Sequence, residues 1–184
     1  MASFAAIPTP LAGLVLVQRK RLEDQRGFFS RLFCADELSA IGFARPVAQI
    51  NQTLTRQRGA VRGLHFQHPP HAEDKFVSCL HGAIFDVAVD LRRGSPSFLK
   101  WHAEMLSAEN GRSLFIPQGF AHGFQALTDD CELIYLHSKP YAAQAEGALN
   151  VNDPALNIAW PLAFTDISQR DSAHPRITEE FNGI

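Results

Sequence analysis

Short apolar runs separated by turn residues fill most of the chain. Runs rich in Val, Ile, Phe and Leu alternate with Gly, Pro, Asn and Asp about every ten residues, a spacing typical of a β-sandwich or barrel. The clearest run, AIFDVAVDLR at 83–92, alternates so that successive side chains point to opposite faces of a strand. Similar runs cover residues 61–67, 75–82, 102–107, 113–117 and 131–138. The pattern predicts an all-β fold, an antiparallel jelly roll with a few short helices.

The other segments predict little regular structure. The one convincing helix is DELSAIG at 36–42, with Asp36 placed to cap it and Gly42 to end it. We expect residues 1 to about 12 to form an extended arm that leads into a strand, and residues from about 161 to 184 to form a loop with a helical turn. No internal repeat or low-complexity linker divides the sequence. We therefore expect one jelly-roll domain over residues 1–184.

Composition narrows the functional classes. The 184 residues are 46% hydrophobic and 20% charged, with a formal net charge of −2, so no basic excess suggests nucleic acid or an anionic membrane as a partner. No apolar run approaches the roughly 20 residues of a membrane-spanning helix, and the N-terminal stretch lacks the leading positive charge of a signal peptide. Cys34, Cys79 and Cys131 form no CxxC pair, which favours buried thiols in a cytoplasmic protein over a disulfide framework.

His65 is an ionisable residue inside an apolar run, VRGLHFQ at 61–67. Strict alternation places His65 on one face with Gly63 and Gln67, and Arg62 on the opposite face. A small jelly roll often has an open-ended interior, and an imidazole there is a candidate general base because its unperturbed pKa is about 6.5. The alternative is a core histidine whose ring is satisfied by a neighbouring polar group.

Three further residues could take part in such chemistry. Lys75 is either a solvated strand end or a cation that stabilises an anion in the interior. Tyr135, which shares a strand face with His137, is either a core residue or an acid. Asp171 lies in the polar segment DISQRDSAHP, and a carboxylate from a late loop could orient a histidine base.

The sequence contains none of the common cofactor or nucleophile motifs. It has no P-loop, no GxGxxG and no GxSxG. His65 and His122 raise the question of a metal-dependent cupin, but no HxH pair occurs, so we expect no metal and no cofactor. Four arginines could grip phosphate, because guanidinium groups match phosphate oxygens; they are Arg26, Arg31, Arg62 and Arg170.

Six segments together resemble one enzyme family. They are, in chain order, RGFFSRLF, VRGLHFQHPP, KFVSCLHGAIFDVAVDLRRGSPSF, LSAENGRSLFIPQGFAHGF, NDPALNIAWP and ISQRDSAHP, and the similarity covers roughly residues 7 to 176. They resemble the dTDP-4-dehydrorhamnose 3,5-epimerases, the nucleotide-sugar epimerases of the rhamnose pathway. The resemblance implies a cupin-like jelly roll, a homodimer that needs no metal, and inversion of carbons beside a 4-keto group on a deoxyhexose carried by a nucleoside diphosphate.

The same resemblance implies a role for individual residues. His65 resembles the catalytic base and Asp171 its partner, Tyr135 resembles the general acid on the opposite sugar face, and Lys75 resembles the residue that steadies the enolate oxygen. Positions around the sugar and diphosphate match Gln49, Asn51, Arg62 and His122. Arg26 and Phe29 match a segment that reaches the nucleotide, partly across the dimer. Tyr141, which could stack on a base, and Arg170 complete the expected binding residues.

The chain departs from the family pattern at three positions. Arg31 stands where many members have glutamate, Pro140 where tyrosine is frequent, and Val151 where tryptophan precedes NDP. We expect these changes near the nucleotide end and the pocket lining, and they leave the nucleotide, the sugar and the number of inverted carbons open. Strict alternation also places Arg62 and His65 on opposite faces of the strand, although the resemblance assigns both to the site. A bend at Gly63 would bring the two side chains to the same side.

The sequence is also compatible with two other functions. One is a non-catalytic cupin that binds a nucleotide sugar, and the other is a metal-dependent cupin enzyme. Exchange of substrate protons with solvent distinguishes the first from an epimerase, and elemental analysis distinguishes the second.

Overall fold

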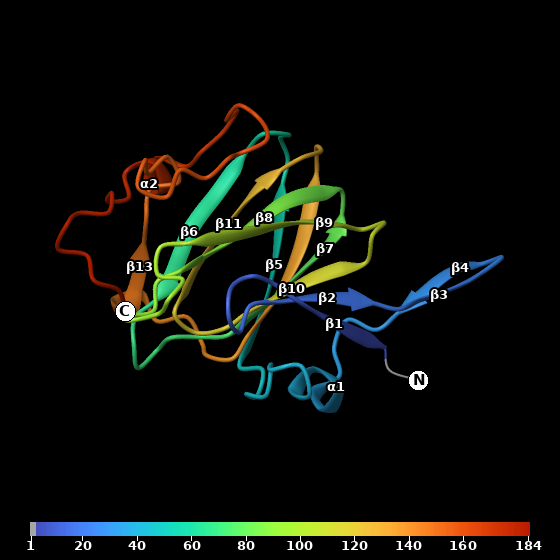
Figure 1. Ribbon diagram of the computed structural model, residues 1–184. Helices are drawn as coiled ribbons and strands as arrows, with labels where there is room; N and C mark the ends of the chain where they lie inside the picture. The colour runs from blue at the N-terminus through green and yellow to red at the C-terminus, as the bar shows by residue number, and fades with distance from the viewer. Residues whose placement is uncertain (1–2) are drawn as a thin grey trace.

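Two antiparallel sheets face each other in the computed structural model, which describes residues 3–184 (Figure 1). The six-stranded sheet has the order β1 (Phe4–Pro8), β2 (Val15–Arg19), β10 (Arg112–Ile116), β7 (Lys75–His81), β12 (Cys131–His137) and β5 (Gln49–Thr55). The five-stranded sheet has the order β13 (Glu146–Ala148), β6 (Val61–Gln67), β11 (Phe120–Ala126), β8 (Ala83–Asp90) and β9 (Trp101–Ser107). The expected all-β, cupin-like jelly roll is confirmed.

Strand β8 shows why the alternating pattern predicts this architecture. Ile84 and Ala88 point into the core between the two sheets, where they join Val77 and Leu133 of the facing sheet. The other side of β8, which includes Val87, belongs to a second core. Partly buried apolar residues of the C-terminal segment pack against that second core and cover the outer face of the five-stranded sheet; they include Trp160, Phe164, Ile167, Ile177 and Phe181. Both faces of β8 are therefore buried.

The helices are short, and one predicted cap is wrong. Helix α1 (Ala35–Ser39) has Cys34 as its N-cap with no side-chain cap bond, and Asp36 lies within the first turn, where its negative charge favours the helix dipole instead. Gly42 ends this region as expected: its φ is +115°, and a Cβ there would lie 2.7 Å from the Phe115 ring. The expected C-terminal helical turn is α2 (Gln169–Ser172). A single 3₁₀ turn, η1 (Ala143–Ala145), precedes β13.

The N-terminal segment is itself part of a sheet. Strand β1 pairs with β2 at the edge of the six-stranded sheet, whereas residues 1–2 of the expected arm lie outside the described residues. Cys79 and Cys131 are buried, Cys34 is half-buried, and all three are free, as expected. Over the described range, the longest helices are far too short to cross a membrane.

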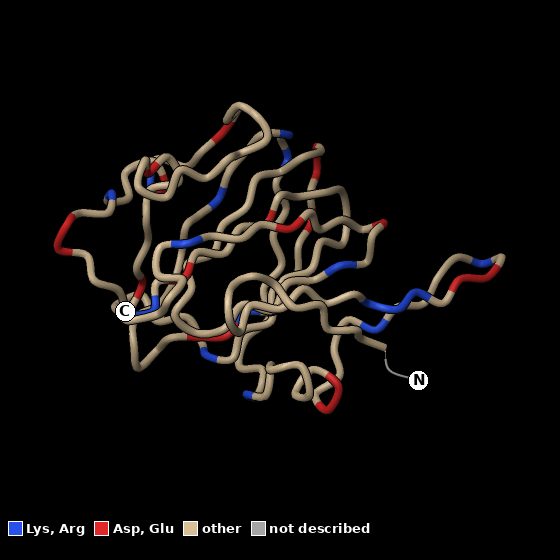
Figure 2. Tube along the Cα trace, in the orientation of Figure 1, with Lys and Arg blue, Asp and Glu red and all other residues tan. Residues whose placement is uncertain are grey.

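A two-stranded hairpin projects from the body of the molecule. It consists of β3 (Arg21–Asp24) and β4 (Gly27–Ser30), drawn at the far right of Figure 1. Leu22, Phe28 and Phe29 on this hairpin are all more than half exposed. Figure 2 shows blue and red segments along the same hairpin, so it also carries both basic and acidic residues.

Candidate active site

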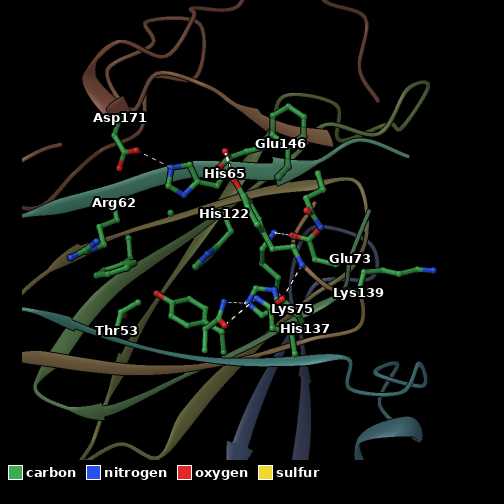
Figure 3. A pocket seen from close by; sticks show the side chains of 18 of the residues that line it. Thr53, Arg62, His65, Glu73, Lys75, His122, His137, Lys139, Glu146 and Asp171 are labelled. Atoms are coloured by element: carbon green, nitrogen blue, oxygen red, sulfur yellow. Dashed lines mark hydrogen bonds and ion pairs between the residues drawn. The ribbon is translucent and has the colours of Figure 1, made fainter. Parts of the chain in front are cut away.

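A cavity of about 530 Å³ opens between the two sheets. Strands β5, β7 and β12 line one side of it and β6 and β11 the other, with α2 at the rim (Figure 3). Ten of the twelve predicted site residues line this cavity: Gln49, Asn51, Arg62, His65, Lys75, His122, Tyr135, Tyr141, Arg170 and Asp171. The fold thus brings together residues that lie up to 122 positions apart, from Gln49 to Asp171.

A bulge in β6 places Arg62 and His65 on the same cavity. His65 pairs with His122 and Arg62 pairs with Phe124, so β6 advances three residues where β11 advances two. Strict alternation is therefore wrong here, and the bend expected at Gly63 is confirmed. Gly63 has φ +137°, and a Cβ on it would lie 2.6 Å from the Gly123 Cα, so only glycine fits.

His65 is hydrogen-bonded to a buried carboxylate. Its Nε2 lies 3.0 Å from Asp171 Oδ1, while Asp171 Oδ2 accepts a bond of 3.2 Å from the Gly63 amide. Burial alone would raise the pKa of Asp171, but hydrogen bonds from His65 and Gly63 and the charge of Arg170 prevail and hold that pKa well below its usual range. The ionised carboxylate favours a proton on Nε2, which leaves Nδ1 as the nitrogen that can accept a proton.

Tyr135 lines the same cavity from the facing sheet, on β12. Its side chain is buried, and burial raises the pKa of the phenol well above its ordinary value, so the hydroxyl keeps its proton near neutrality. The ring packs edge-on to His122 and stacks with His137, each at 6.0 Å between ring centroids. An imidazole and a phenol therefore border one cavity from opposite sides.

Lys75 is buried beside the cavity and paired with an acid. Its Nζ lies 2.5 Å from Glu73 Oε1, and Gln67 Nε2 donates to Glu73 Oε2 at 2.8 Å. Burial, and then the charge of Lys75, lower the pKa of His137 to about 4, so that imidazole is neutral at pH 7. Lys75 is therefore not the solvated strand end that its position in the sequence also allowed.

His65 and His122 do not converge on one metal. His122 Nε2 lies 2.7 Å from Asp86 Oδ1, so each histidine is bonded to its own carboxylate. Burial raises the pKa of Asp86, and the charge and hydrogen bond of His122 oppose that shift. Among the described residues, the cluster with metal-ligand spacing is a different one, His65 with Asp171 and His174.

Hydrogen bonds connect the polar rim of the cavity. The Tyr141 amide donates to Gln49 Oε1 at 2.9 Å, and the Tyr141 hydroxyl donates to Glu146 Oε2 at 3.0 Å. Arg170 NH1 lies 3.3 Å from the other oxygen of Glu146. Gln49 in turn donates to Asn51 Oδ1 at 3.0 Å.

The predicted arginine set does not assemble within one chain. Arg62 and Arg170 line the cavity, whereas Arg26 lies on the projecting hairpin and pairs with Asp24 at 2.6 Å. Arg31 also lies outside the cavity lining, and it pairs with Glu37 at 2.6 Å.

The three positions that depart from the family pattern lie outside the cavity lining of a single chain. None of Arg31, Pro140 and Val151 lines the cavity. Val151 is buried in the core on the outer face of the five-stranded sheet, and Pro140 contributes only its carbonyl oxygen, which accepts a 3.4 Å bond from Gln67. Phe29, the remaining predicted binding residue, lies on β4 of the hairpin and is 63% exposed.

Some cavity residues have little or no sequence signal. His137 follows Tyr135 by two residues on a strand, so alternation could have placed it in the cavity. Glu73 precedes β7 in an irregular segment, and no periodicity applies there. Lys139 follows β12 in another irregular segment, and Glu146 begins β13, a strand of three residues that is too short to show alternation.

The fold and cavity define a jelly-roll protein in which a half-buried histidine, paired with a buried aspartate, faces a tyrosine. Comparison with known proteins identifies the family, because residues 8–179 match the model of the dTDP-4-dehydrorhamnose 3,5-epimerases. The curated enzyme of that name from Sinorhizobium fredii is 41% identical over 174 residues, which is 92% of this chain and 87% of that protein. The chain belongs to the dTDP-4-dehydrorhamnose 3,5-epimerase family.

Solved structures of epimerases are also similar to this chain. The Bacillus anthracis dTDP-4-dehydrorhamnose 3,5-epimerase with TDP and PPi bound has a TM-score of 0.92 and 35% identity, covering 95% of this chain and 99% of that one. The Legionella pneumophila dTDP-6-deoxy-D-glucose-3,5-epimerase in complex with dTDP-4-keto-L-rhamnose has a TM-score of 0.88 and 38% identity, covering 93% and 91%.

Proposed function

We propose that this protein epimerises a 4-keto-6-deoxyhexose linked to a nucleoside diphosphate, at C3, C5 or both, with its own side chains as acid and base. The observation that carries the proposal is the placement of the His65–Asp171 pair and Tyr135 on opposite sides of one cavity. Family membership supports the substrate class, and the Legionella relative has dTDP-4-keto-L-rhamnose bound.

The first chemical step is removal of a proton beside the ketone. Nδ1 of His65 takes the proton from carbon, the C–H electrons form the enolate, and Asp171 stabilises the resulting imidazolium. Negative charge develops on the keto oxygen, and the ammonium group of Lys75 stabilises it. The pairing with Glu73 holds Lys75 in the cavity wall, because both side chains are buried.

The second step returns a proton from the other face. Tyr135 donates its hydroxyl proton to the enolate carbon, which inverts the centre and leaves a phenolate opposite an imidazolium. Proton exchange with solvent then resets both groups. Because the pKa of Tyr135 is raised by burial, the phenol is protonated before each turnover and its phenolate is readily reprotonated after it.

The cavity also suits the anionic part of the substrate. Arg62, Lys139 and Arg170 line it together with Lys75, and guanidinium groups match phosphate oxygens. We place the diphosphate between Arg62 and Arg170, with Gln49 and Asn51 binding polar groups nearby. His122, held by Asp86, faces the sugar, and Tyr141, which is 56% exposed at the rim, stacks on the base.

The hairpin supports a homodimer. Leu22, Phe28 and Phe29 are exposed on it, and Ile50 and Leu54 are exposed on β5, the edge strand of the six-stranded sheet. Large exposed apolar residues on an open edge are typical of a surface that another chain covers. We propose that two copies associate and that Arg26 and Phe29 of one copy reach the nucleotide in the cavity of the other.

Subunit mixing tests this dimer directly. A His65→Ala chain and a Phe29→Ala chain are each expected to be poorly active, but their mixed dimer contains one intact site. Random mixing should restore about a quarter of wild-type activity. No recovery, or a monomer by analytical ultracentrifugation, would contradict the arrangement.

The free thiols are compatible with a reducing compartment, so we propose a cytoplasmic location. Fractionation of the native host with antibody detection tests it, and recovery of the protein from an extracellular fraction would contradict it.

Proton exchange with solvent tests the chemistry. The protein is incubated in D₂O with dTDP-4-keto-6-deoxyglucose, and deuterium at C3 and C5 is followed by NMR. Deuterium at both positions with inversion indicates a 3,5-epimerase, and deuterium at one position indicates a single-centre epimerase. Tight binding with no exchange would show instead a nucleotide-sugar-binding protein, and activity that requires stoichiometric iron, manganese or nickel would show a metal-dependent enzyme.

A further inference from the structure

His174 lies behind the His65–Asp171 pair and is not used by the chemistry above. Its Nε2 is 3.3 Å from the same Asp171 oxygen that His65 contacts. The relative orientation of the His174 ring and the Asp171 carboxylate does not fit a hydrogen bond. This buried nitrogen therefore has no hydrogen-bond partner among the described residues. A buried ring nitrogen without a partner is destabilising, so its place beside a carboxylate calls for an explanation.

The three groups have the spacing of a metal site. Their ligand atoms all lie within 4.8 Å of one another, and the two histidine nitrogens lie 3.0 and 3.3 Å from Asp171 Oδ1. Ligand atoms at about 2.0–2.1 Å from a tetrahedral zinc ion are about 3.3 Å apart, so only small side-chain movements are needed. Two imidazoles and one carboxylate suit Zn²⁺, Co²⁺ and related ions, and leave a fourth position for water.

We propose that His65, Asp171 and His174 form a binding site for a divalent transition metal, and that the bound metal inhibits the enzyme. Coordination by Nε2 of His65 displaces the proton on that nitrogen to Nδ1 of the same ring. Nδ1 then has no lone pair with which to accept a proton from the substrate. The metal therefore blocks the base from the side of Asp171 and His174; His65 and Asp171 line the sugar cavity, whereas His174 does not.

Arg170 is the group that opposes the metal. Its NH2 lies 3.4 Å from His65 Nε2 and its Nε lies 3.6 Å from Asp171 Oδ1. The side chain is 58% exposed and is also paired with Glu146, so it can turn toward the rim and keep that ion pair. A substrate diphosphate that holds Arg170 would favour the same movement, whereas in the free enzyme Arg170 weakens metal binding.

Metal binding can be measured without activity. The full-length protein is treated with a chelator, dialysed and titrated with Co²⁺, whose visible absorption is intense in a tetrahedral site. We expect saturation at one Co²⁺ per chain, displaced by Zn²⁺. His174→Ala and His174→Gln should each weaken binding about 100-fold or more, because one of three protein ligands is lost.

A matched control is available at another histidine–carboxylate pair. His102 Nε2 lies 2.8 Å from Glu104 Oε1, outside the cavity and with no second histidine in the cluster. His102→Ala should leave Co²⁺ binding unchanged. Absent or several-site Co²⁺ absorption in the wild type, or equally tight binding by both His174 variants, would overturn the site.

Inhibition is the second readout, and it depends on the proposed role of His65. Stoichiometric Zn²⁺ should abolish deuterium exchange in the wild type, and chelator should restore it. Each His174 variant, compared with its own metal-free rate, should need about 100-fold more Zn²⁺. If metal binds at this site while exchange continues, the inhibition is refuted. If no exchange occurs even without metal, the proposed epimerase activity fails, and the Co²⁺ titration still decides the metal site.

Discussion

Replacing Asp171 with asparagine removes one charge from the site at nearly constant volume. The carboxylate oxygen lies 3.0 Å from His65 Nε2, and at an effective dielectric constant of about 20 a carboxylate and an imidazolium at that distance attract each other by about 5.5 kcal/mol. This attraction acts only after His65 takes the substrate proton. The dipole of the asparagine amide and water that enters the site replace part of this attraction. We therefore expect the transition state to lose about 4 kcal/mol of stabilisation, which slows the reaction roughly a thousandfold.

The rate to measure is deuterium incorporation at C3 and C5 in D₂O, followed by NMR under single-turnover and steady-state conditions. Glu104→Gln is the matched control, because it neutralises the carboxylate of a histidine–carboxylate pair outside the cavity; its rate should equal that of the wild type. Thermal unfolding and nucleotide binding verify that the Asp171 variant is folded. A folded Asp171→Asn protein that exchanges within tenfold of the wild-type rate would refute the pairing as a source of catalysis.

Three further outcomes follow from the same structure. Tyr135→Phe should still let deuterium exchange into unchanged substrate through His65 but should lose inversion, and NMR that shows inverted product at the wild-type rate would exclude Tyr135 as the acid. Gly63→Ala should lower stability by about 2–4 kcal/mol in urea unfolding, because its Cβ would lie 2.6 Å from the Gly123 Cα at φ +137°; an unchanged midpoint would contradict the bulge. Burial raises the pKa of Asp90, but hydrogen bonds led by the one from Arg92 prevail and lower that pKa from 3.8 to about 2. The ionised carboxylate therefore contributes about 2 kcal/mol to the free energy of unfolding above pH ~4. This contribution should be lost as the pH falls toward 2. Acid unfolding of Asp90→Asn should lack this loss, and identical acid profiles would disprove it.

The strands were predictable because hydrophobic alternation records which face of a strand is buried. It identified β8 correctly, with Ile84 and Val87 in different cores. It failed at β6, where Arg62 and His65 face one cavity. The bulge there depends on contact between Gly63 and Gly123 across two strands, and a local pattern carries no information about a partner 60 residues away.

The candidate site was predictable only in part. Resemblance to a family brought His65 and Asp171 together, since no spacing rule joins residues 106 positions apart. The same resemblance named Arg26 and Phe29, which a single chain leaves on a hairpin away from the cavity. Glu73 was missed because it lies in an irregular segment, although its ion pair with Lys75 sets the charge of that cavity wall.

The surroundings of Tyr135 and of the His65–Asp171 pair support the roles of acid and base that we propose for them. Burial raises the pKa of Tyr135 and so keeps a proton on that side of the cavity. On the other side, hydrogen bonds and Arg170 overcome burial and keep Asp171 charged, which lets His65 accept a proton. In the proposed mechanism, these surroundings support Tyr135 as the group that donates a proton and His65 as the group that accepts one. Loss of the Asp171 charge would therefore slow proton removal by His65 in the proposed mechanism, even if every contact to the sugar remained.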